Sequence, residues 1–204
     1  GTNNKKKGLN SNTIMLGNQH KIEIGNDNTS ILGGSRAIVT RKGEVVTAGG
    51  GQRTLSDSTS AATFNSRRQS STIELSGVTI DNTATNLTVQ GDGSSFINVK
   101  HNSIIGYDIY ITRLELGGSS GTAGNYSYRN IRGAVQIDDS YNMAFVVGFS
   151  RNIAKIGQNG TCIMVDTSTS SLKSISVNVQ DRNNVHNLWS ASVTLHEVIS
   201  ETTF

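Results

Sequence analysis

Residues 13–36 read Thr13-Ile-Met-Leu-Gly-Asn-Gln-His20, Lys21-Ile-Glu-Ile-Gly-Asn-Asp-Asn28 and Thr29-Ser-Ile-Leu-Gly-Gly-Ser-Arg36. These three octads share the pattern x-apolar-x-apolar-Gly followed by polar residues, so Gly17, Gly25 and Gly33 recur at a spacing of eight. A fixed period is the mark of a chain that builds by stacking short units. Apolar residues at i and i+2 share one face of a strand, and the glycine with Asn or Asp allows the next turn.

One octad is too short to fold alone. It buries only two apolar side chains, which do not repay the conformational entropy lost when its residues are ordered. The apolar residues Ile14, Leu16, Ile22, Ile24 and Leu32 therefore need neighbours. In so short an array we expect other copies of the same chain to supply them, which predicts a stalk intertwined in a multi-chain protein. A pair of ordinary hairpins is the alternative.

The composition favours an all-β protein. Only 16% of the 204 residues are charged, against the usual quarter, and proline is absent. No stretch keeps a helical period of 3.6. The single cysteine, Cys162, has no intrachain partner for a disulfide, and we expect it to be a small buried residue.

Charge and hydropathy limit the kinds of partner that the chain is expected to have. The net charge is +3, and Lys5, Lys6 and Lys7 supply much of the excess. These lysines have no interleaved aromatic residues, so we expect a solvated start to the chain and no nucleic acid partner. No segment approaches 18 consecutive apolar residues, so we expect no membrane insertion.

Three parts can be distinguished along the chain. Residues 1–51 hold the octads and form the expected β stalk, 52–70 lack a clean period and read as a connector, and 71–204 form a terminal knob. In the knob, short alternating segments between turn signals predict an antiparallel β-sandwich or jelly-roll-like fold. The expected strands are 71–79, 86–90, 96–99, 107–116, 126–137, 144–156, 161–166, 172–180 and 188–198.

Two segments of the knob carry further expectations. Trp189 alternates with Ala191, Val193 and Leu195, so its side chain should point into the core. The flat apolar run Ala144-Phe-Val-Val-Gly-Phe149 would aggregate on an open sheet edge. We therefore expect this run at the centre of a sheet or sealed between subunits.

From about residue 35 to 198 the chain resembles the C-terminal region of tailed-bacteriophage tail fibre and tailspike-like proteins. The residues that carry the resemblance are Gly-Glu-Val-Val-Thr-Ala-Gly-Gly (43–50), Ser71-Thr-Ile-Glu-Leu-Ser-Gly-Val-Thr79, Leu87-Thr-Val-Gln-Gly-Asp-Gly93, Val177-Asn-Val-Gln180 and Leu188-Trp-Ser-Ala-Ser-Val-Thr-Leu-His-Glu-Val198. In that family similar segments follow a stalk of short Gly/Asn-rich repeats. The resemblance implies a homotrimer located in the virion, at the host-facing end of a tail fibre.

The sequence offers little catalytic chemistry. It lacks a phosphate-binding glycine loop and a Gly-x-Ser-x-Gly elbow. The best carboxylate pair is Asp138-Asp139, but neighbours on a strand point to opposite faces, and Asp-Asp-Ser-Tyr-Asn is ordinary turn composition. We therefore expect no catalytic residues and no enzyme activity, although two subunits could still pair carboxylates across an interface.

The histidines show no metal-ligand spacing. They are His20, His101, His186 and His196, and no His-x-His pair occurs among them. Only His20, at a turn between repeats, is placed where copies of one chain could share an axial metal. We expect no metal site and no cofactor.

The recognition residues are expected on two loops of the knob. Tyrosines near loops give rigid amphipathic contacts at low entropic cost. Loop 117–128 supplies Asn125, Tyr126 and Tyr128, and loop 138–143 supplies Asp138, Asp139 and Tyr141. The predicted function is attachment of a phage to a polysaccharide or an outer-surface protein of its host. The alternatives are a trimerisation or capping domain and, with less support, a fragment of a polysaccharide-degrading tailspike.

Overall fold

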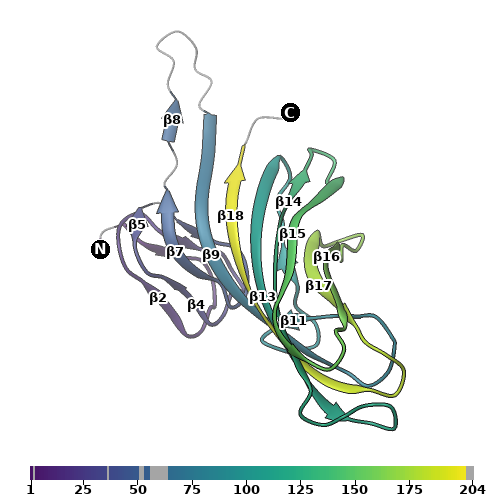
Figure 1. The fold of residues 1–204 in the computed structure, drawn as a ribbon. Helices are drawn as coiled ribbons and strands as arrows, with labels where there is room; N and C mark the ends of the chain where they lie inside the picture. Colours follow the sequence, from purple (N-terminus) through teal and green to yellow (C-terminus); the bar gives the residue numbers. More distant parts are fainter. Residues whose placement is uncertain (2, 36, 51–52, 56–63, 201–204) are drawn as a thin grey trace.

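The computed structural model describes residues 1, 3–35, 37–50, 53–55 and 64–200, and within these ranges the chain forms strands and no helix (Figure 1). A coil of short strands, residues 1–50, lies beside a larger knob of long strands. No helix in the described residues is long and apolar enough to cross a membrane.

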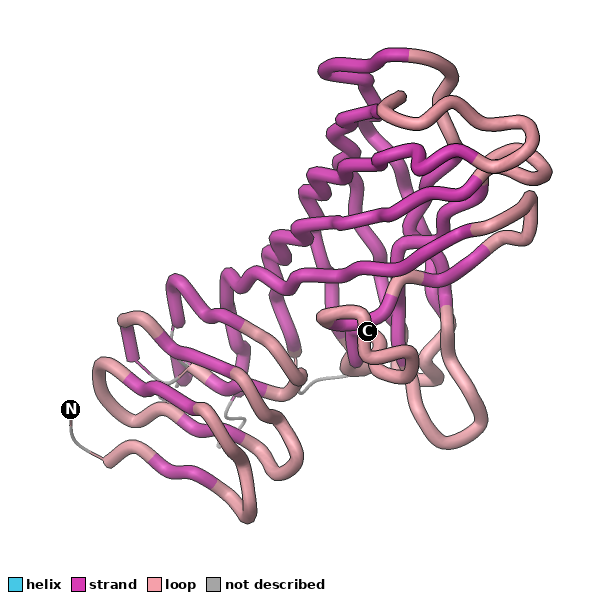
Figure 2. The backbone as a smooth tube through the Cα atoms, turned by 90° about the horizontal axis from the view of Figure 1, so that it is seen from below, coloured by secondary structure: helices cyan, strands magenta, loops and turns pink. Residues whose placement is uncertain are grey.

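The coil is a stack of parallel rungs (Figure 2). Its strands are β1 (Lys5–Lys6), β2 (Thr13–Met15), β3 (Lys21–Ile22), β4 (Thr29–Ile31), β5 (Gly34–Ser35), β6 (Ile38–Val39) and β7 (Val45–Gly50). β2 pairs with β4 and places Thr13 beside Thr29, while β1 pairs with β3 and places Lys5 beside Lys21. Partners therefore lie 16 residues apart. Each turn of the coil takes two octads, and successive octads belong to two different sheets.

Asparagine side chains in the turns repeat the same spacing. The backbone N–H of Asn26 donates to Oδ1 of Asn10 at 2.8 Å. Nδ2 of Asn12 donates to Oδ1 of Asn28 at 2.9 Å. Asn12 and Asn28 also share the left-handed conformation, with φ of 52° and 55°. The true structural repeat is thus twice the octad.

Of the five apolar residues expected to be buried in the coil, Ile22 is buried and the other four are exposed. Ile22, Ile31, Ala37, Val39 and Val46 form its small core. By contrast, Ile14, Leu16, Ile24 and Leu32 are each more than half exposed. Side chains alternate along a strand. Because Met15 and Ile31 point inward, their sequence neighbours Ile14, Leu16 and Leu32 point outward. The stacking neighbours of each octad also include octads of the same chain, which the sequence analysis assigned to other copies.

The knob contains two antiparallel sheets that share one core. The long strands β9 (Phe64–Thr79), β13 (Ser103–Gly117), β14 (Tyr126–Ile137), β15 (Met143–Ile156) and β18 (His186–Ile199) lie in the order β15-β14-β13-β18-β9. The second sheet contains β10 (Thr85–Asn86), β12 (Ile97–Asn98), β16 (Thr161–Asp166) and β17 (Ser174–Gln180). β11 (Thr88–Val89) and β8 (Arg53–Leu55) both pair with β9. The strand segments predicted for the knob therefore agree closely with these bounds.

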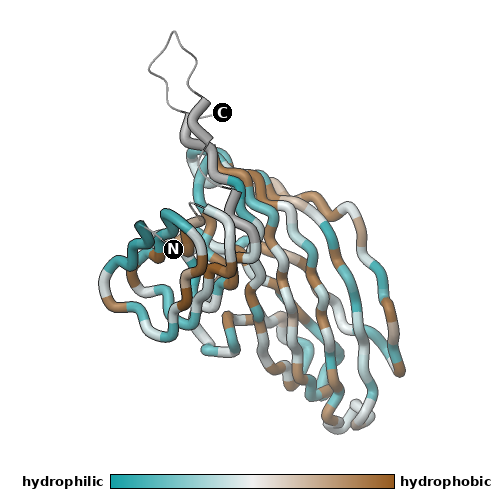
Figure 3. Tube along the Cα trace, turned by 90° about the vertical axis from the view of Figure 1, so that its left-hand side faces the viewer, coloured by the Kyte–Doolittle hydropathy of each residue, from teal (hydrophilic) through white to brown (hydrophobic). Residues whose placement is uncertain are grey.

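Hydrophobic and hydrophilic residues alternate along the long strands of the knob (Figure 3). One face of the large sheet points toward the second sheet and buries Ile73, Ile109, Val135 and Val193. Trp189 and Cys162 are buried in the same core, as predicted. The indole Nε1–H of Trp189 donates to Oγ1 of Thr79 at 3.0 Å, which satisfies its polar atom.

The start of β9 and the position of β15 in the sheet differ from the expected ones. β9 begins at Phe64, so the long strand reaches into the expected connector 52–70, of which 52 and 56–63 lie outside the described residues. β15, which contains the run 144–149, lies at the end of the large sheet and not at its centre. Its outer backbone edge has no strand partner in the described part of the chain. Sealing of this edge between subunits stays a prediction.

The coil and the knob share one sheet. β7, the last strand of the coil, pairs with β9 antiparallel, so the large sheet continues into β4 and β2. Arg41, fully buried beside this junction, donates to Glu44 Oε1 at 3.0 Å and to Glu197 Oε1 at 2.5 Å. Burial alone would lower the pKa of Arg41, but the charges of Glu197 and Glu44 outweigh it and raise the pKa. Arg41 therefore stays charged and ties the coil to β18.

Candidate functional site

The six predicted recognition residues fall into two groups at opposite ends of β14. Asn125, Tyr126 and Tyr128 lie at its beginning, while Asp138, Asp139 and Tyr141 follow its last residue. A strand of 12 residues separates them, which is a distance of roughly 35 Å. The structure therefore does not bring the six residues into one site.

The first group lies on the outer face of the large sheet. The rings of Tyr128 and Tyr110 stack with centroids 5.9 Å apart. Tyr126 is paired in register with Leu114 of β13 and Ile156 of β15. Asn125 is half-buried and closes the β13–β14 hairpin, where its carbonyl accepts from the N–H of Glu115 at 2.8 Å. None of Asn125, Tyr126 and Tyr128 lines the pocket described below.

A buried ion-pair cluster holds the loop that precedes this group. Glu115 is buried beside Arg113 and Arg182, with Nη2 of Arg182 3.2 Å from its carboxylate. Arg113 also pairs with Asp181 of the β17–β18 turn. The backbone N–H of Thr122 donates to Glu115, which fixes the Gly/Ser-rich loop 117–124. The alternating sequence of β13 does not indicate this cluster, because Asp181 and Arg182 come from a turn that is distant in the sequence.

The second group builds a tight turn between β14 and β15. The Asp138 carboxylate accepts from the N–H of Ser140 at 2.9 Å and from the N–H and side-chain amide of Asn142, both at 2.7 Å. The Asn142 side chain and backbone are the largest cause of a lowered pKa at Asp138. Asp139 is exposed and accepts only a long hydrogen bond of 3.4 Å from Ser140 Oγ. The turn interpretation of this acidic pair is confirmed, because Asp138 is engaged within the turn.

The same turn fixes the ring of Tyr141. Its backbone adopts the left-handed conformation with φ of 64°, which is uncommon for an aromatic residue. The ring meets His101 edge-on at a centroid distance of 5.3 Å. Nζ of Lys173 lies 6.0 Å from the ring centroid on its face, and the ring packs against the knob core. Tyr141 is therefore the most constrained of the predicted recognition residues.

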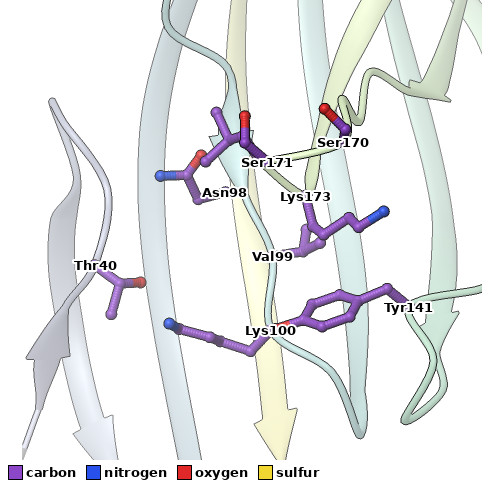
Figure 4. Close-up of a pocket in the computed structure, with 9 residues that line it drawn as sticks. Thr40, Asn98, Val99, Lys100, Tyr141, Ser170, Ser171 and Lys173 are labelled. Carbon is purple, nitrogen blue, oxygen red and sulfur yellow. The ribbon is translucent and has the colours of Figure 1, made fainter.

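Tyr141 borders a pocket of about 400 Å³ at this end of the knob (Figure 4). Its lining includes Thr40, Asn98, Lys100, Tyr141, Ser171 and Lys173. They come from the coil, from the end of β12, from the β14–β15 turn and from the β16–β17 loop. Only Tyr141 among them was predicted from the sequence, since no local pattern indicates that segments so far apart in the chain come together.

His20 has a structural role within the coil. It is buried, its Nε2 lies 2.9 Å from the carbonyl oxygen of Leu16, and its Nδ1 accepts from the N–H of Ala37 at 3.1 Å. The ring therefore bridges two successive rungs and satisfies their backbone groups. Among the residues that the structure describes, no three His, Cys, Asp or Glu side chains come together as a metal site would require.

Among solved structures, the chain is partly similar to two phage tailspike proteins. No protein-family model matches the chain, and no curated protein matches it. The tailspike protein of Acinetobacter baumannii phage AM24 aligns over 89% of this chain and 37% of its own, with 8% identity and a TM-score of 0.38. Tailspike protein gp49 of Acinetobacter baumannii bacteriophage Fri1, a capsular polysaccharide depolymerase, aligns over 89% of this chain and 33% of its own, with 8% identity and a TM-score of 0.32. The chain thus spans about a third of either protein, and similarity this low carries no argument about its activity.

Proposed function

We propose that the chain belongs to the tail of a bacteriophage, as part of a tail fibre or tailspike-like protein, and that its knob attaches the virion to the host cell. The first support is the sequence resemblance, carried by residues 43–50 and by the closing segment 188–198. The second is the arrangement of a short repeat coil that continues into a knob through one sheet. The proposed location is the host-facing end of the virion tail.

The observation that carries the proposal is the rigid turn at 138–142 beside a polar pocket. Asp138 fixes the turn, and the turn fixes the ring of Tyr141 at the pocket. Binding to a preformed site loses little conformational entropy, so such a site suits recognition. Hydrolysis of a glycoside would need two carboxyl groups facing each other across the substrate. Because the Asp138 carboxylate is engaged by its own turn, we propose non-covalent binding without catalysis.

The proposed mechanism is multivalency in a homotrimer. Three identical weak sites on one rigid tip raise avidity without any new contact. An apolar row on the outer face of the large sheet supports assembly: Val78, Leu188, Leu114, Tyr126 and Ile156 face one another in direct register across five strands. All five are at least 36% exposed. A contiguous exposed apolar surface of this kind marks an interface.

The two groups of predicted residues then take different roles. Tyr126 belongs to the apolar row, where it contributes to contact between copies. Tyr141, with Asp139 on the same turn, contributes to contact with the host surface. A purely structural role, as a cap that keeps the coil from fraying, is the second candidate, and the continuous sheet from coil to knob favours it.

A cell-binding experiment tests the proposal. The fluorescently labelled chain is incubated with a panel of capsulated and non-capsulated bacterial strains, and bound protein is measured by flow cytometry. We expect binding to a subset of strains and a loss of about tenfold in Tyr141→Ala, the size expected when an aromatic contact of about 1.4 kcal/mol is removed. Tyr110→Ala is the matched control, because Tyr110 is a partly exposed tyrosine on the outer sheet face. A chain that assembles but binds no strain would favour the structural cap, and equal loss in both variants would contradict the placement at Tyr141.

A further inference from the structure

We infer that the pocket between the coil and the knob binds an anionic sugar residue, one that carries a carboxylate or phosphate group. The inference rests on the proposed attachment function and names the chemistry of the receptor. Most of the binding residues in this proposal, namely Thr40, Asn98, Lys100 and Lys173, lie outside the two loops that the sequence indicated.

The charge of the pocket is the first argument. Lys100 and Lys173 both line it, and no Asp or Glu does so among the described residues. Neither lysine has an ion-pair partner in the described part of the chain. Other cations nearby are paired, such as Lys42, whose Nζ lies 2.9 Å from the Asp92 carboxylate. The Lys100 ammonium points toward Thr40, and the Lys173 ammonium lies over the Tyr141 ring (Figure 4). The lining thus carries positive charge with no carboxylate to balance it, which favours an anionic ligand.

The hydroxyl and amide groups of the pocket are the second argument. Oγ1 of Thr40 is buried and has no hydrogen-bond partner. A buried polar atom without a partner is rare in folded proteins and calls for a physical explanation. Asn98 and Ser171 add further donors and acceptors to the pocket from the knob. Groups of this kind match the hydroxyls of a sugar, which a simple inorganic anion lacks.

The aromatic wall is the third argument. Tyr141 presents a ring that its turn, His101 and the knob core hold in place. A rigid ring offers an apolar surface to the C–H face of a sugar at low entropic cost. A volume of about 400 Å³ lies in the range of small-ligand sites. The pocket thus combines charge, hydroxyl and ring surfaces, which together describe an acidic sugar (Figure 4).

Arg41 makes the two walls of the pocket a single rigid unit. Its Nε donates to the carbonyl oxygen of Asn98 at 2.6 Å, on the knob wall. Its partner Glu44 accepts from the backbone N–H of Thr40 at 3.1 Å, on the coil wall. Thr40 and Asn98 are therefore held at a fixed separation before any ligand arrives. Preorganisation of this kind reduces the cost of binding.

A printed array of bacterial surface oligosaccharides tests the inference. It carries neutral members and members with carboxylate or phosphate groups, and these two acidic sets show which anion is preferred. We expect the intact chain to bind acidic members and the double variant Lys100→Ala/Lys173→Ala to lose about tenfold or more of that binding. Raising the ionic strength from about 0.05 to about 0.5 M should weaken it, since salt screens exposed charges.

The matched control is Lys5→Ala/Lys6→Ala. It removes the same charge from exposed positions on β1 that do not line the pocket. Thr40→Val tests the hydroxyl with little change in shape, and a thermal unfolding curve for each variant checks that it folds. Binding to neutral members alone, or equal losses in the control and the lysine variant, would overturn the inference.

Cell binding measured in parallel separates the two proposals. If the intact chain binds bacteria and Lys100→Ala/Lys173→Ala binds equally well, the pocket inference fails while attachment stands. If the intact chain binds no strain and no acidic oligosaccharide, both proposals fail.

Discussion

At the residue scale, the local sequence was sufficient to predict a turn or the burial of a side chain where these depend on neighbouring residues in the chain. The turn at Asp138 and the burial of Trp189 and Cys162 followed from turn chemistry and from alternation. The pocket could not be predicted in the same way. Lys100 and Lys173 are ordinary surface residues in the sequence, and only the fold places them in one cavity.

Cys162 gives a prediction about a single side chain. It is 5% exposed, and burial raises the pKa of its thiol despite the opposing effect of Arg129. The thiolate is the reactive form, so native protein at pH 8 should react with iodoacetamide on the order of tenfold more slowly than protein in urea. Mass spectrometry of timed samples measures both rates. Equal rates would contradict the buried, neutral thiol.

At the element scale, the octads show what a repeat does and does not determine. Their period predicted stacked short strands, which the structure confirms. Their apolar pattern could not say which of two faces points inward, because a shift of one residue exchanges the faces. The pairs Asn10/Asn26 and Asn12/Asn28 carry the 16-residue period in the sequence itself. They are the signal that would have identified two octads as one turn of a coil.

The contact between coil and knob gives a prediction at the same scale. Arg41→Ala leaves Glu44 and Glu197 buried without their cation. Removing one partner of a buried ion pair costs about 3–5 kcal/mol, so the free energy of unfolding should fall by that amount. Urea titration at fixed protein concentration, followed by the fluorescence of Trp189, measures it. Lys42→Ala is the neighbouring control, because its partly exposed pair with Asp92 should contribute less than about 1 kcal/mol. A similar loss in both variants would contradict the anchoring role of Arg41.

At the scale of the whole molecule, the large sheet contains all the described strands except those of the second sheet of the knob and the coil strands β1, β3 and β6. The strand segments were predictable from alternation, but the order of the strands in the sheet was not. β18, for example, lies between β9 and β13, although both are far from β18 in the sequence. Within the knob, the arrangement leaves apolar side chains uncovered in two places. One is the apolar row, and the other is β15, an edge strand that exposes Val146, Val147 and Phe149. An open edge with apolar side chains invites pairing with another chain.

Assembly of three copies is the expected way to cover these surfaces. Three chains of 21.7 kDa each give a solution mass of about 65 kDa, which light scattering coupled to size exclusion measures. Leu188 lies at the centre of the apolar row, with Val78 on one side and Leu114 on the other. Leu188→Lys places a charge in the row without touching the core. Burial of this unpaired charge in an interface would be costly. The variant should therefore lose the 65 kDa species.

Ser190→Lys is the control for that experiment. Ser190 lies two residues further along β18, on the same face and outside the row. It should keep the mass of the parent chain, since the added lysine remains in solvent. A monomeric parent, or a Leu188→Lys variant that assembles as fully as Ser190→Lys, would show that the row is not an interface. In that case the sites at Tyr141 would act singly, and their affinity for the host would have to come from the pocket alone.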